Sequence, residues 1–420
     1  MKSENTMSIR VKPYTERSES TLNGEIFYVL SFKNGCYLKL TARAFHIIKC
    51  LNGTMDMDDI IHALNKEGYI VSELDLNKFV TDFLIPRKLL EGQDDGIVIH
   101  KNHDRLWIRR PLVESGRFIW FYRIVQPLFA KPVVLALVLA SAFSLMQCLL
   151  MLSNGQFNFI NQLNSVQIIL ISIFAMFIHE LGHAAAAYRY NVTTGKIGVG
   201  LYLITLVFYI DLTNTWSLDK KQRAICDLSG MYFQSMVALI VLAAYLFTGA
   251  TSLIVTALII YIGTLSNLFP FLRLDGYWLL SDCVGIQNLN LKLVPSIMNG
   301  GHEILRYIAV RKSSREYTLN RERLFCGIYG IVYLTAIVFM FAMGILSFWR
   351  IIIDFPFLLS KFQMLAVSFT GGDVANTISI LNEIALFVLP FIFVIIYLMQ
   401  SVLAHHRTER NGKCYFNALT

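Results

Sequence analysis

Long apolar stretches fill most of the chain after residue 131 and limit what it can fold into. Each has roughly the 20 residues that a helix needs to cross a lipid bilayer. Hydrophobic residues make up 55% of the 420 residues and charged residues only 16%, against about 25% charged in soluble domains. The sequence therefore predicts a mainly α-helical, polytopic membrane protein and excludes a purely soluble enzyme, a disordered chain and a small disulfide scaffold. About six transmembrane helices are expected, at residues 132–152, 166–187, 230–249, 251–270, 324–349 and 378–404.

Basic residues flank these stretches and predict the orientation of the chain. The formal net charge is +8, and Lys and Arg beside apolar segments are typical of the cytoplasmic side of a membrane. Arg123 and Lys131 precede the first predicted span, whereas the connection 153–163 carries no charge. The N-terminal region and the C-terminal tail are therefore expected in the cytoplasm, with the protein in the cell membrane. No nucleic-acid-binding module is recognisable, so nucleic acid is not expected as a partner.

One apolar segment, residues 195–210, does not fit the pattern of spans. It is too short to cross the bilayer, and it is rich in β-branched and aromatic residues. Both its ends fall on the cytoplasmic side in the predicted topology. Non-helical backbone at membrane depth is tolerated where it is buried in protein, so we expect a re-entrant hairpin here.

The N-terminal region has the pattern of a small soluble domain. Alternating residues at 27–32 and 36–40 flank Asn34-Gly35, which is a strong hairpin signal. Thr41 is a candidate N-cap for a helix that stops at Asn52-Gly53, and two further helices are expected near 56–65 and 73–90. A hairpin followed by three helices predicts a winged-helix-like domain. The expected division is a domain over 1–92, a basic linker over 93–131, a membrane domain over 132–404 and a tail over 405–420.

Short motifs in this region resemble a known family. Leu40-Thr41 ends the hairpin, Leu51-Asn52-Gly53-Thr54 follows the first helix, and Asp58-Asp59-Ile60-Ile61 lies in the second. This order resembles PqqD-like domains, which bind the leader part of ribosomally made peptides that undergo modification. The resemblance covers about the first hundred residues and implies a peptide-binding role. A generic winged helix with a structural role is the alternative.

The string His179-Glu180-Leu181-Gly182-His183 lies inside the second predicted span. Residues four apart share one face of a helix, so both imidazoles can reach a single Zn²⁺. Glu180 lies beside them, where it can take a proton from metal-bound water. Ionisable side chains inside a membrane are costly without partners. A metal would supply the partner, whereas a pair of ordinary core histidines would not.

A catalytic zinc needs a third protein ligand and keeps a fourth position for water. The candidate lies at the end of the fourth predicted span, in the segment 267–276. Pro270 and Gly276 interrupt the helix there, next to Asp275. Unwound backbone at membrane depth is typical of a polar site. Asp275 is therefore the candidate third ligand.

The two motifs together resemble the site-2 protease family of intramembrane zinc metalloproteases, over about residues 132–282. The resemblance implies that His179, His183 and Asp275 bind zinc, that Glu180 is the general base and that Asn267 assists the substrate or the oxyanion. It also implies that the segment near 195–210 supplies an edge strand for extended substrate. Two departures, Leu272 for a proline and Ser229-Gly230-Met231 for Ala-Gly-Pro, affect the expected backbone shape near the site. The stretch 275–282 resembles the branch of peptide zinc metalloproteases, which often accompany bacterial peptide maturation and export.

These features predict an intramembrane zinc metalloendopeptidase that processes a ribosomally synthesised, post-translationally modified precursor peptide during maturation and export. The expected partners are the precursor with its leader, membrane lipid, an ABC transporter and a peptide-modifying enzyme. Two alternatives stay open. One is a non-proteolytic peptide-binding subunit of an export or immunity system, although a purely structural histidine pair needs no neighbouring base. The other is a protease that cleaves a membrane-anchored regulator.

Overall fold

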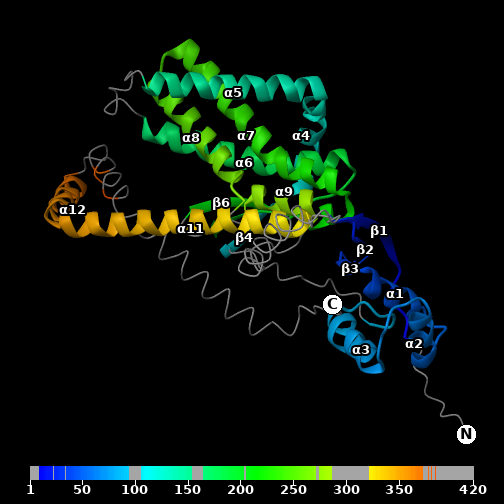
Figure 1. Cartoon of the computed structure of the whole chain (residues 1–420). Coiled ribbons are helices and arrows are strands. Elements are labelled where there is room, and N and C mark those ends of the chain that lie inside the picture. The colour runs from blue at the N-terminus through cyan, green and yellow to red at the C-terminus, as the bar shows by residue number, and fades with distance from the viewer. Residues whose placement is uncertain are drawn as a thin grey trace, which may run out of the picture.

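The structure is a computed structural model. It describes residues 9–93 except 22 and 34, together with 106–153, 164–202, 205–270, 274–285, 321–371 and the single positions 377, 380 and 384. Over these residues the chain is mainly helical. Figure 1 shows a small N-terminal unit of strands and helices beside a larger helical body.

The N-terminal unit pairs three antiparallel strands in the order β1-β2-β3. The expected hairpin is present as β2 and β3, and the preceding polar strand β1 was not predicted. Thr41, Asp56 and Ser72 cap the three helices, because each side chain accepts a hydrogen bond from a backbone N–H in the first turn. The elements are β1 (Tyr14–Ser20), β2 (Ile26–Phe32), β3 (Tyr37–Thr41), α1 (Ala42–Cys50), α2 (Met57–Lys66), α3 (Glu73–Lys78), η1 (Phe79–Leu84) and η2 (Ile85–Arg87).

One face of this sheet forms the core of the unit. Leu30, Leu38 and Leu40 are buried against the helices, together with Ile47 and Leu64. Period-two alternation places Phe27 and Val29 on the opposite face. Both are also buried, at 6% and 2% exposed, although they are not members of that core. The sheet is therefore covered on both sides.

The segment expected as a basic linker, residues 93–131, contains regular structure from Leu106 onward. Strand β4 (Leu106–Glu114) pairs antiparallel with β5, and its register shifts beside Pro111. Proline is tolerated there because β4 is at the edge of its sheet. The strand was not predicted because Arg109, Arg110 and Pro111 interrupt the apolar alternation that is typical of strands. Three short helices then precede the long apolar helices: η3 (Ser115–Phe118), α4 (Ile119–Ile124) and η4 (Gln126–Phe129).

Four described helices are long and apolar enough to cross a membrane: α5 (Lys131–Ser153), α6 (Ser165–Arg189), α7 (Lys220–Thr248) and α11 (Arg321–Ile353). They overlap four of the predicted spans. The fourth predicted span is α8 (Thr251–Asn267), which is shorter, and the sixth lies almost wholly outside the described residues. Two further helices, α9 (Asp275–Val284) and α12 (Phe355–Thr370), were not predicted as such.

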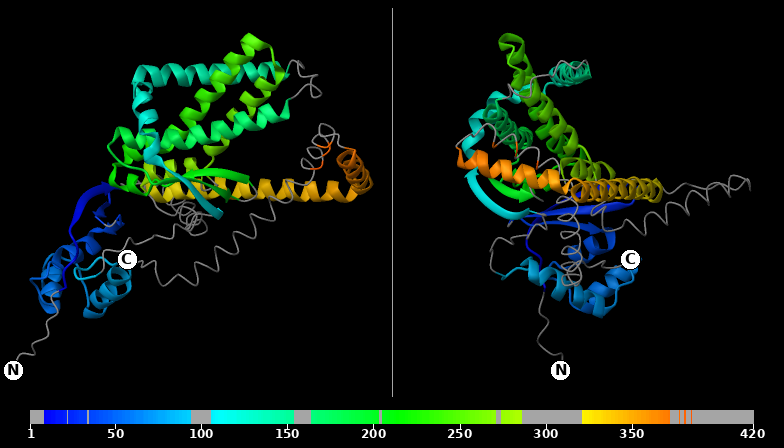
Figure 2. Two further views of the ribbon diagram at one scale, coloured as in Figure 1. Left: turned by 180° about the vertical axis from the view of Figure 1, so that it is seen from behind. Right: turned by 90° about the vertical axis from the view of Figure 1, so that its left-hand side faces the viewer.

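The segment 195–210 contains two paired strands, which confirms the predicted hairpin, whereas its re-entry into the membrane stays a prediction. Strands β5 (Lys196–Tyr202) and β6 (Thr205–Ile210) are antiparallel, and with β4 they make a sheet of order β4-β5-β6. A short helix, η6 (Thr213–Ser217), connects β6 to α7. Figure 2 shows the curved strand β4, in cyan, from two further directions. Phe208 of β6 contacts Phe177 of α6, with ring centroids 5.6 Å apart, so the hairpin packs against the helix that carries the two histidines.

Candidate metal centre

Helix α6 presents His179 and His183 to the same side. Both are buried, and their Nε2 atoms lie 3.1 Å apart. The four-residue spacing gives this arrangement directly, because it returns almost to the same helix face. Two ring nitrogens therefore point to one small volume inside the protein.

Asp275 completes the cluster from a different part of the chain. It is the first residue of α9, and its Oδ2 lies 2.8 Å from His179 Nε2 and 3.5 Å from His183 Nε2. The beginning of α9 lies against the end of α8. A side chain on Gly276 would overlap the backbone carbonyl of Leu268, so glycine permits this close approach beside Asp275. Three potential ligand atoms from two helices thus converge.

Two hydrogen bonds fix which nitrogen each histidine offers. His183 Nδ1 lies 2.7 Å from the backbone carbonyl of Cys226. A carbonyl can only accept, so Nδ1 carries the proton and Nε2 keeps its lone pair. His179 Nδ1 lies 3.0 Å from Oε1 of Gln234, which gives the same tautomer. Both acceptors belong to α7, and such outer partners are typical of metal-binding histidines.

Glycine allows α6 and α7 to approach closely at this point. A Cβ on Gly230 of α7 would overlap Nε2 of His183 and lie 2.7 Å from Nε2 of His179. A Cβ on Gly182 of α6 would lie 2.6 Å from the carbonyl oxygen of Ser229. The space beside the imidazole nitrogens therefore exists because α7 has no side chain at position 230.

The donor set fits a zinc ion. Two imidazole lone pairs facing each other at close range repel unless a cation or a proton lies between them. Ligand bonds of about 2.0–2.2 Å in a tetrahedral site place the ligand atoms about 3.3 Å apart. The observed separations of 2.8, 3.1 and 3.5 Å are close to that value. His179, His183 and Asp275 would hold the ion, and a fourth position would stay open.

The other two predicted site residues lie nearby. Glu180 follows His179 on α6, and its carboxylate accepts a hydrogen bond from the backbone N–H of Ile210 at the end of β6. Asn267 is the last residue of α8. Its backbone carbonyl lies against Gly276, next to Asp275. The structure thus brings Glu180 beside the cluster and places the backbone of Asn267 against the first turn of α9, next to Asp275.

Comparison with known proteins gives one similarity. A Bacillus subtilis (strain 168) protein named "Putative peptide zinc metalloprotease protein YydH" is 27% identical over 115 residues. The match covers 27% of this chain and 46% of that protein, so the chain spans about half the length of the curated relative it matches. No protein-family model matches the chain, and no solved structure matches it.

The residues of α7 that support the histidines were not predicted from the sequence. Gln234 was not among the predicted site residues, and Cys226 acts through its backbone, which no motif reveals. A signal was nevertheless present. Cys226, Gly230 and Gln234 follow one another at four-residue spacing, which places them on one face of a helix.

Proposed function

We propose that this chain is a membrane-embedded zinc endopeptidase that cleaves a ribosomally made precursor peptide. The observation that carries the proposal is the convergence of the two Nε2 atoms and the Asp275 carboxylate, with Glu180 beside them. The distant similarity to a protein named as a peptide zinc metalloprotease points to the same chemistry.

When bound, zinc lowers the pKa of a coordinated water to about 7 and polarises the scissile carbonyl. Glu180 is the residue that can move the proton. It is not one of the three ligands, and the amide of Ile210 holds its carboxylate in place. We assign it the role of accepting a proton from the attacking water and passing it to the leaving amine. Asn267 is proposed to assist the oxyanion or the substrate.

The sheet next to the cluster offers a place for extended substrate. Among the described residues, β6 has a strand neighbour on one side only, β5. Its last residue, Ile210, contacts Glu180 through the backbone. A peptide that added to the open edge of β6 would pair its backbone with that strand. Such a peptide would run directly to the proposed base.

The N-terminal unit suggests the substrate class. Its hairpin and three helices carry the motifs that resemble PqqD-like, leader-binding domains. A leader held there would raise the local concentration of the precursor at the membrane. We place this unit and the tail in the cytoplasm, with an ABC transporter and a peptide-modifying enzyme as the partners that would export and modify the peptide.

A Glu180→Gln variant tests the proposal. Purified protein, loaded with zinc in detergent, would be incubated with a mixed library of unmodified peptides, and cleavage would be followed by mass spectrometry. We expect the variant to keep its zinc but to lose cleavage by about 10²- to 10⁴-fold, the usual contribution of a general base. Glu114→Gln is the matched control, because that glutamate is exposed on β4. Cleavage by the Glu180 variant at the control's rate would contradict the proposal.

A further inference from the structure

The N-terminal unit is docked on the membrane domain through the second face of its sheet. Tyr37 Oη lies 3.4 Å from Oδ1 of Asn214 in η6. Arg17 Nη1 donates to the backbone carbonyl of Ser217, at 2.6 Å. Lys39 Nζ donates to the backbone carbonyl of Gly285, at 2.7 Å. This contact explains why Phe27 and Val29 are buried although they face away from the core of their own unit. In Figure 1 strand β1 reaches the larger helical body.

A buried ion cluster lies at the centre of the interface. Arg223, in the second turn of α7, donates from Nη1 and Nη2 to the two carboxylate oxygens of Glu19 in β1, at 2.9 and 3.1 Å. Its Nε donates to Oδ2 of Asp282 in α9, at 2.9 Å. The side chains of Arg223 and Glu19 are only 4% and 5% exposed. A charge buried to this extent is unfavourable when its partner is removed, so Arg223 holds the two carboxylates together.

Helix α9 connects this cluster to the candidate metal centre. It has 10 residues, or about 15 Å of length. Asp275 is its first residue, and Asp282 lies two turns further on, on the same face. The helix ends at Val284, and the carbonyl of the capping residue Gly285 accepts a hydrogen bond from Lys39. The N-terminal unit therefore binds the C-terminal end of α9, and the N-terminal end of the same helix supplies the candidate ligand Asp275.

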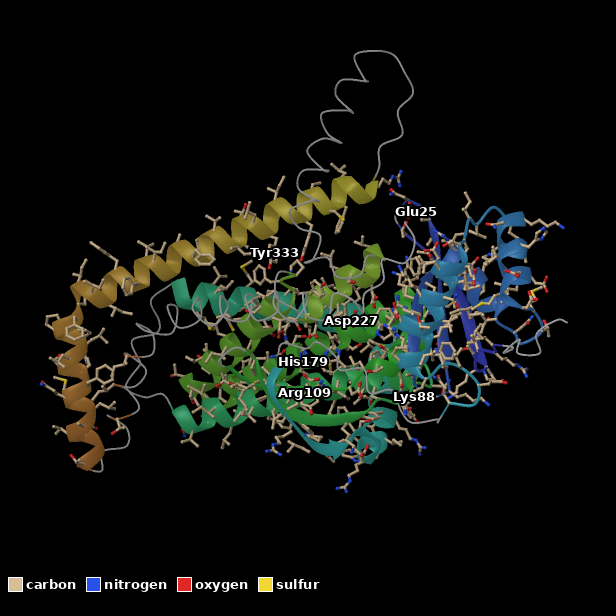
Figure 3. The ribbon with its side chains drawn as sticks, turned by 90° about the horizontal axis from the view of Figure 1, so that it is seen from below. Glu25, Lys88, Arg109, His179, Asp227 and Tyr333 are labelled. Carbon is tan, nitrogen blue, oxygen red and sulfur yellow. The ribbon has the colours of Figure 1, made fainter. Side chains whose placement is uncertain are left out.

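Helix α7 makes a second connection along the same line. Arg223, Cys226, Gly230 and Gln234 lie on one face, and each contacts either the ion cluster or a histidine. Asp227 lies between the two sites and interacts electrostatically with Asp282 and Asp275. In the view of Figure 3, Asp227 lies between His179 and the N-terminal unit. The interface and the metal centre are thus joined by two helices.

We propose that Arg223 is a positioning residue that couples the docking of the N-terminal unit to the geometry of the metal centre. With Glu19 in place, Arg223 and Lys39 fix the end of α9, so that Asp275 is held at the distance from the histidines that a metal ion requires. With the unit undocked, the end of α9 loses the hydrogen bond from Lys39, and Arg223 loses the Glu19 carboxylate that holds its guanidinium in place beside Asp282. The third ligand is then less well placed. The inference rests on the proposed function only in taking His179, His183 and Asp275 as a metal site.

Coupling of this kind is reciprocal. If docking strengthens metal binding by a given factor, metal binding must strengthen docking by the same factor. Fluorophores at exposed positions 66, on α2, and 117, on η3, would report the docked fraction of the intact protein by energy transfer. We expect removal of zinc from the wild-type protein to lower the transfer and its return to restore it. Energy transfer that is unchanged by zinc would overturn the inference without any substitution.

Glu19→Gln tests the ion cluster itself, and Glu25→Gln is its control, because Glu25 is exposed on the same unit (Figure 3). Each full-length variant would be titrated with Zn²⁺ against a competing chelator and with Co²⁺ by visible absorption. We expect Glu19→Gln to lower both the docked fraction and the Zn²⁺ affinity, the latter about tenfold or more, and to alter the Co²⁺ spectrum. Glu25→Gln should match the wild type.

Two results would overturn the coupling. In one, Glu19→Gln undocks the unit and leaves Zn²⁺ affinity and the Co²⁺ spectrum unchanged. In the other, Glu19→Gln leaves docking as it is in the wild type. Neither readout depends on peptide cleavage. A wild-type protein that binds zinc, shows the coupling and cleaves no peptide would therefore contradict the proposed function while supporting this inference.

Discussion

Two hydrogen-bond acceptors on α7 decide how the candidate site can act. The carbonyl of Cys226 and the amide oxygen of Gln234 each face an Nδ1 atom, so both histidines offer Nε2. A neutral imidazole without such a partner would exchange between tautomers, and its ring would be free to rotate. The residues that orient the ligands therefore matter nearly as much as the ligands themselves.

Gln234→Leu should weaken zinc binding without removing a ligand. The substitution keeps the volume of the side chain but leaves Nδ1 of His179 without its acceptor. We expect a 10- to 100-fold loss of zinc affinity, the usual effect of losing such a partner, measured by chelator competition. Gln167→Leu is the matched control, because Gln167 also makes a hydrogen bond between helices, with Ser252 at 2.6 Å. Equal losses in the two variants would mean that the effect is general destabilisation.

Gly230→Ala should block the site by bulk alone. The new methyl group would overlap Nε2 of His183, where the ion would bind, and neither α6 nor α7 can move aside while they pack at Gly182. We expect zinc binding and cleavage to be lost, with the helical circular dichroism retained. At Gly263 of α8 a methyl group would meet only Nε2 of Gln234, at an ordinary 3.5 Å. Gly263→Ala should therefore bind zinc normally, and normal binding by Gly230→Ala would refute the assigned position of the ion.

At the scale of single residues, the sequence indicated the candidate ligands better than the residues that would support them. His179, Glu180 and His183 form a compact motif, and Asp275 follows a helix break, so both signals are local. The supports are not local. Gln234 is 55 positions from His179, and only the packing of α6 against α7 brings them together. Gly230 could not be given a role because its meaning depends on which helix faces it.

Helix α7 is the element that organises the site, and it begins earlier than its apolar sequence indicates. The predicted span started at residue 230, whereas the helix starts at Lys220. Asp219 accepts from the N–H of Gln222, and Gln222 completes a capping box. The first turns carry charged residues that a hydropathy pattern excludes, and Arg223 is one of them. The sequence therefore predicted only the apolar part of α7, from residue 230 onward. It did not predict the charged first turns, which contact the N-terminal unit.

Leu206→Pro should impair the proposed binding of substrate to the open edge of β6 without unfolding the β5–β6 hairpin. The amide of Ile210 points away from β5, towards Glu180, and period-two alternation puts the amide of Leu206 on the same outer side. Proline there would remove a donor from the open edge and leave the bonds to β5 intact, as proline does on edge strands. We expect unchanged zinc affinity and peptide cleavage that falls at least tenfold. Leu206→Thr, which keeps the N–H, should cleave as the wild type does.

The elements that the sequence did not predict share a physical cause. Strand β1 is polar, and β4 contains Arg109, Arg110 and Pro111, so neither shows the apolar alternation typical of strands. Each is stabilised by pairing with a partner, β2 or β5, rather than by its own pattern. The hairpin at 27–40 was predictable because its Asn-Gly step and alternating residues are local signals. The one at 195–210 was predictable because its apolar run is too short to cross a membrane and is rich in β-branched and aromatic residues.

At the scale of the whole molecule, the N-terminal unit is part of the structure that surrounds the candidate site. The sequence indicated a separate unit joined by a basic linker, because nothing local reveals that Glu19 meets Arg223, 204 positions away. The contact buries a pair of opposite charges, Glu19 and Arg223. Glu19 would have its pKa raised by burial, but the hydrogen bond and charge of Arg223, with Arg17 and Lys39, lower it below the usual value. Docking therefore keeps this carboxylate charged.

Docking should strengthen as the pH rises above 8, because of Lys39. Burial in the interface lowers the pKa of Lys39 from 10.5 to about 8. The negative charge of Glu19 raises this pKa, whereas the positive charges of Lys220 and Arg223 lower it further. In the undocked unit Lys39 would lie on an open sheet face, with a pKa near the ordinary value of about 10.4. At a pH between the docked pKa of about 8 and the undocked pKa of about 10.4, Lys39 is protonated in the undocked state and neutral in the docked state. Docking therefore releases a proton. Raising the pH through this window then favours docking, by at most about tenfold per pH unit.

The prediction can be checked by energy transfer between labels at 66 and 117, in urea sufficient to lower the docked fraction. We expect the docking constant to be flat from pH 7 to 8 and to rise from pH 8 to 10. Lys39→Met removes the titrating group and should abolish that rise, while Lys49→Met, altered at an exposed lysine of α1, should keep it. Docking that weakens above pH 8, or a rise that persists in Lys39→Met, would show that Lys39 is not buried against Gly285 as the structure has it.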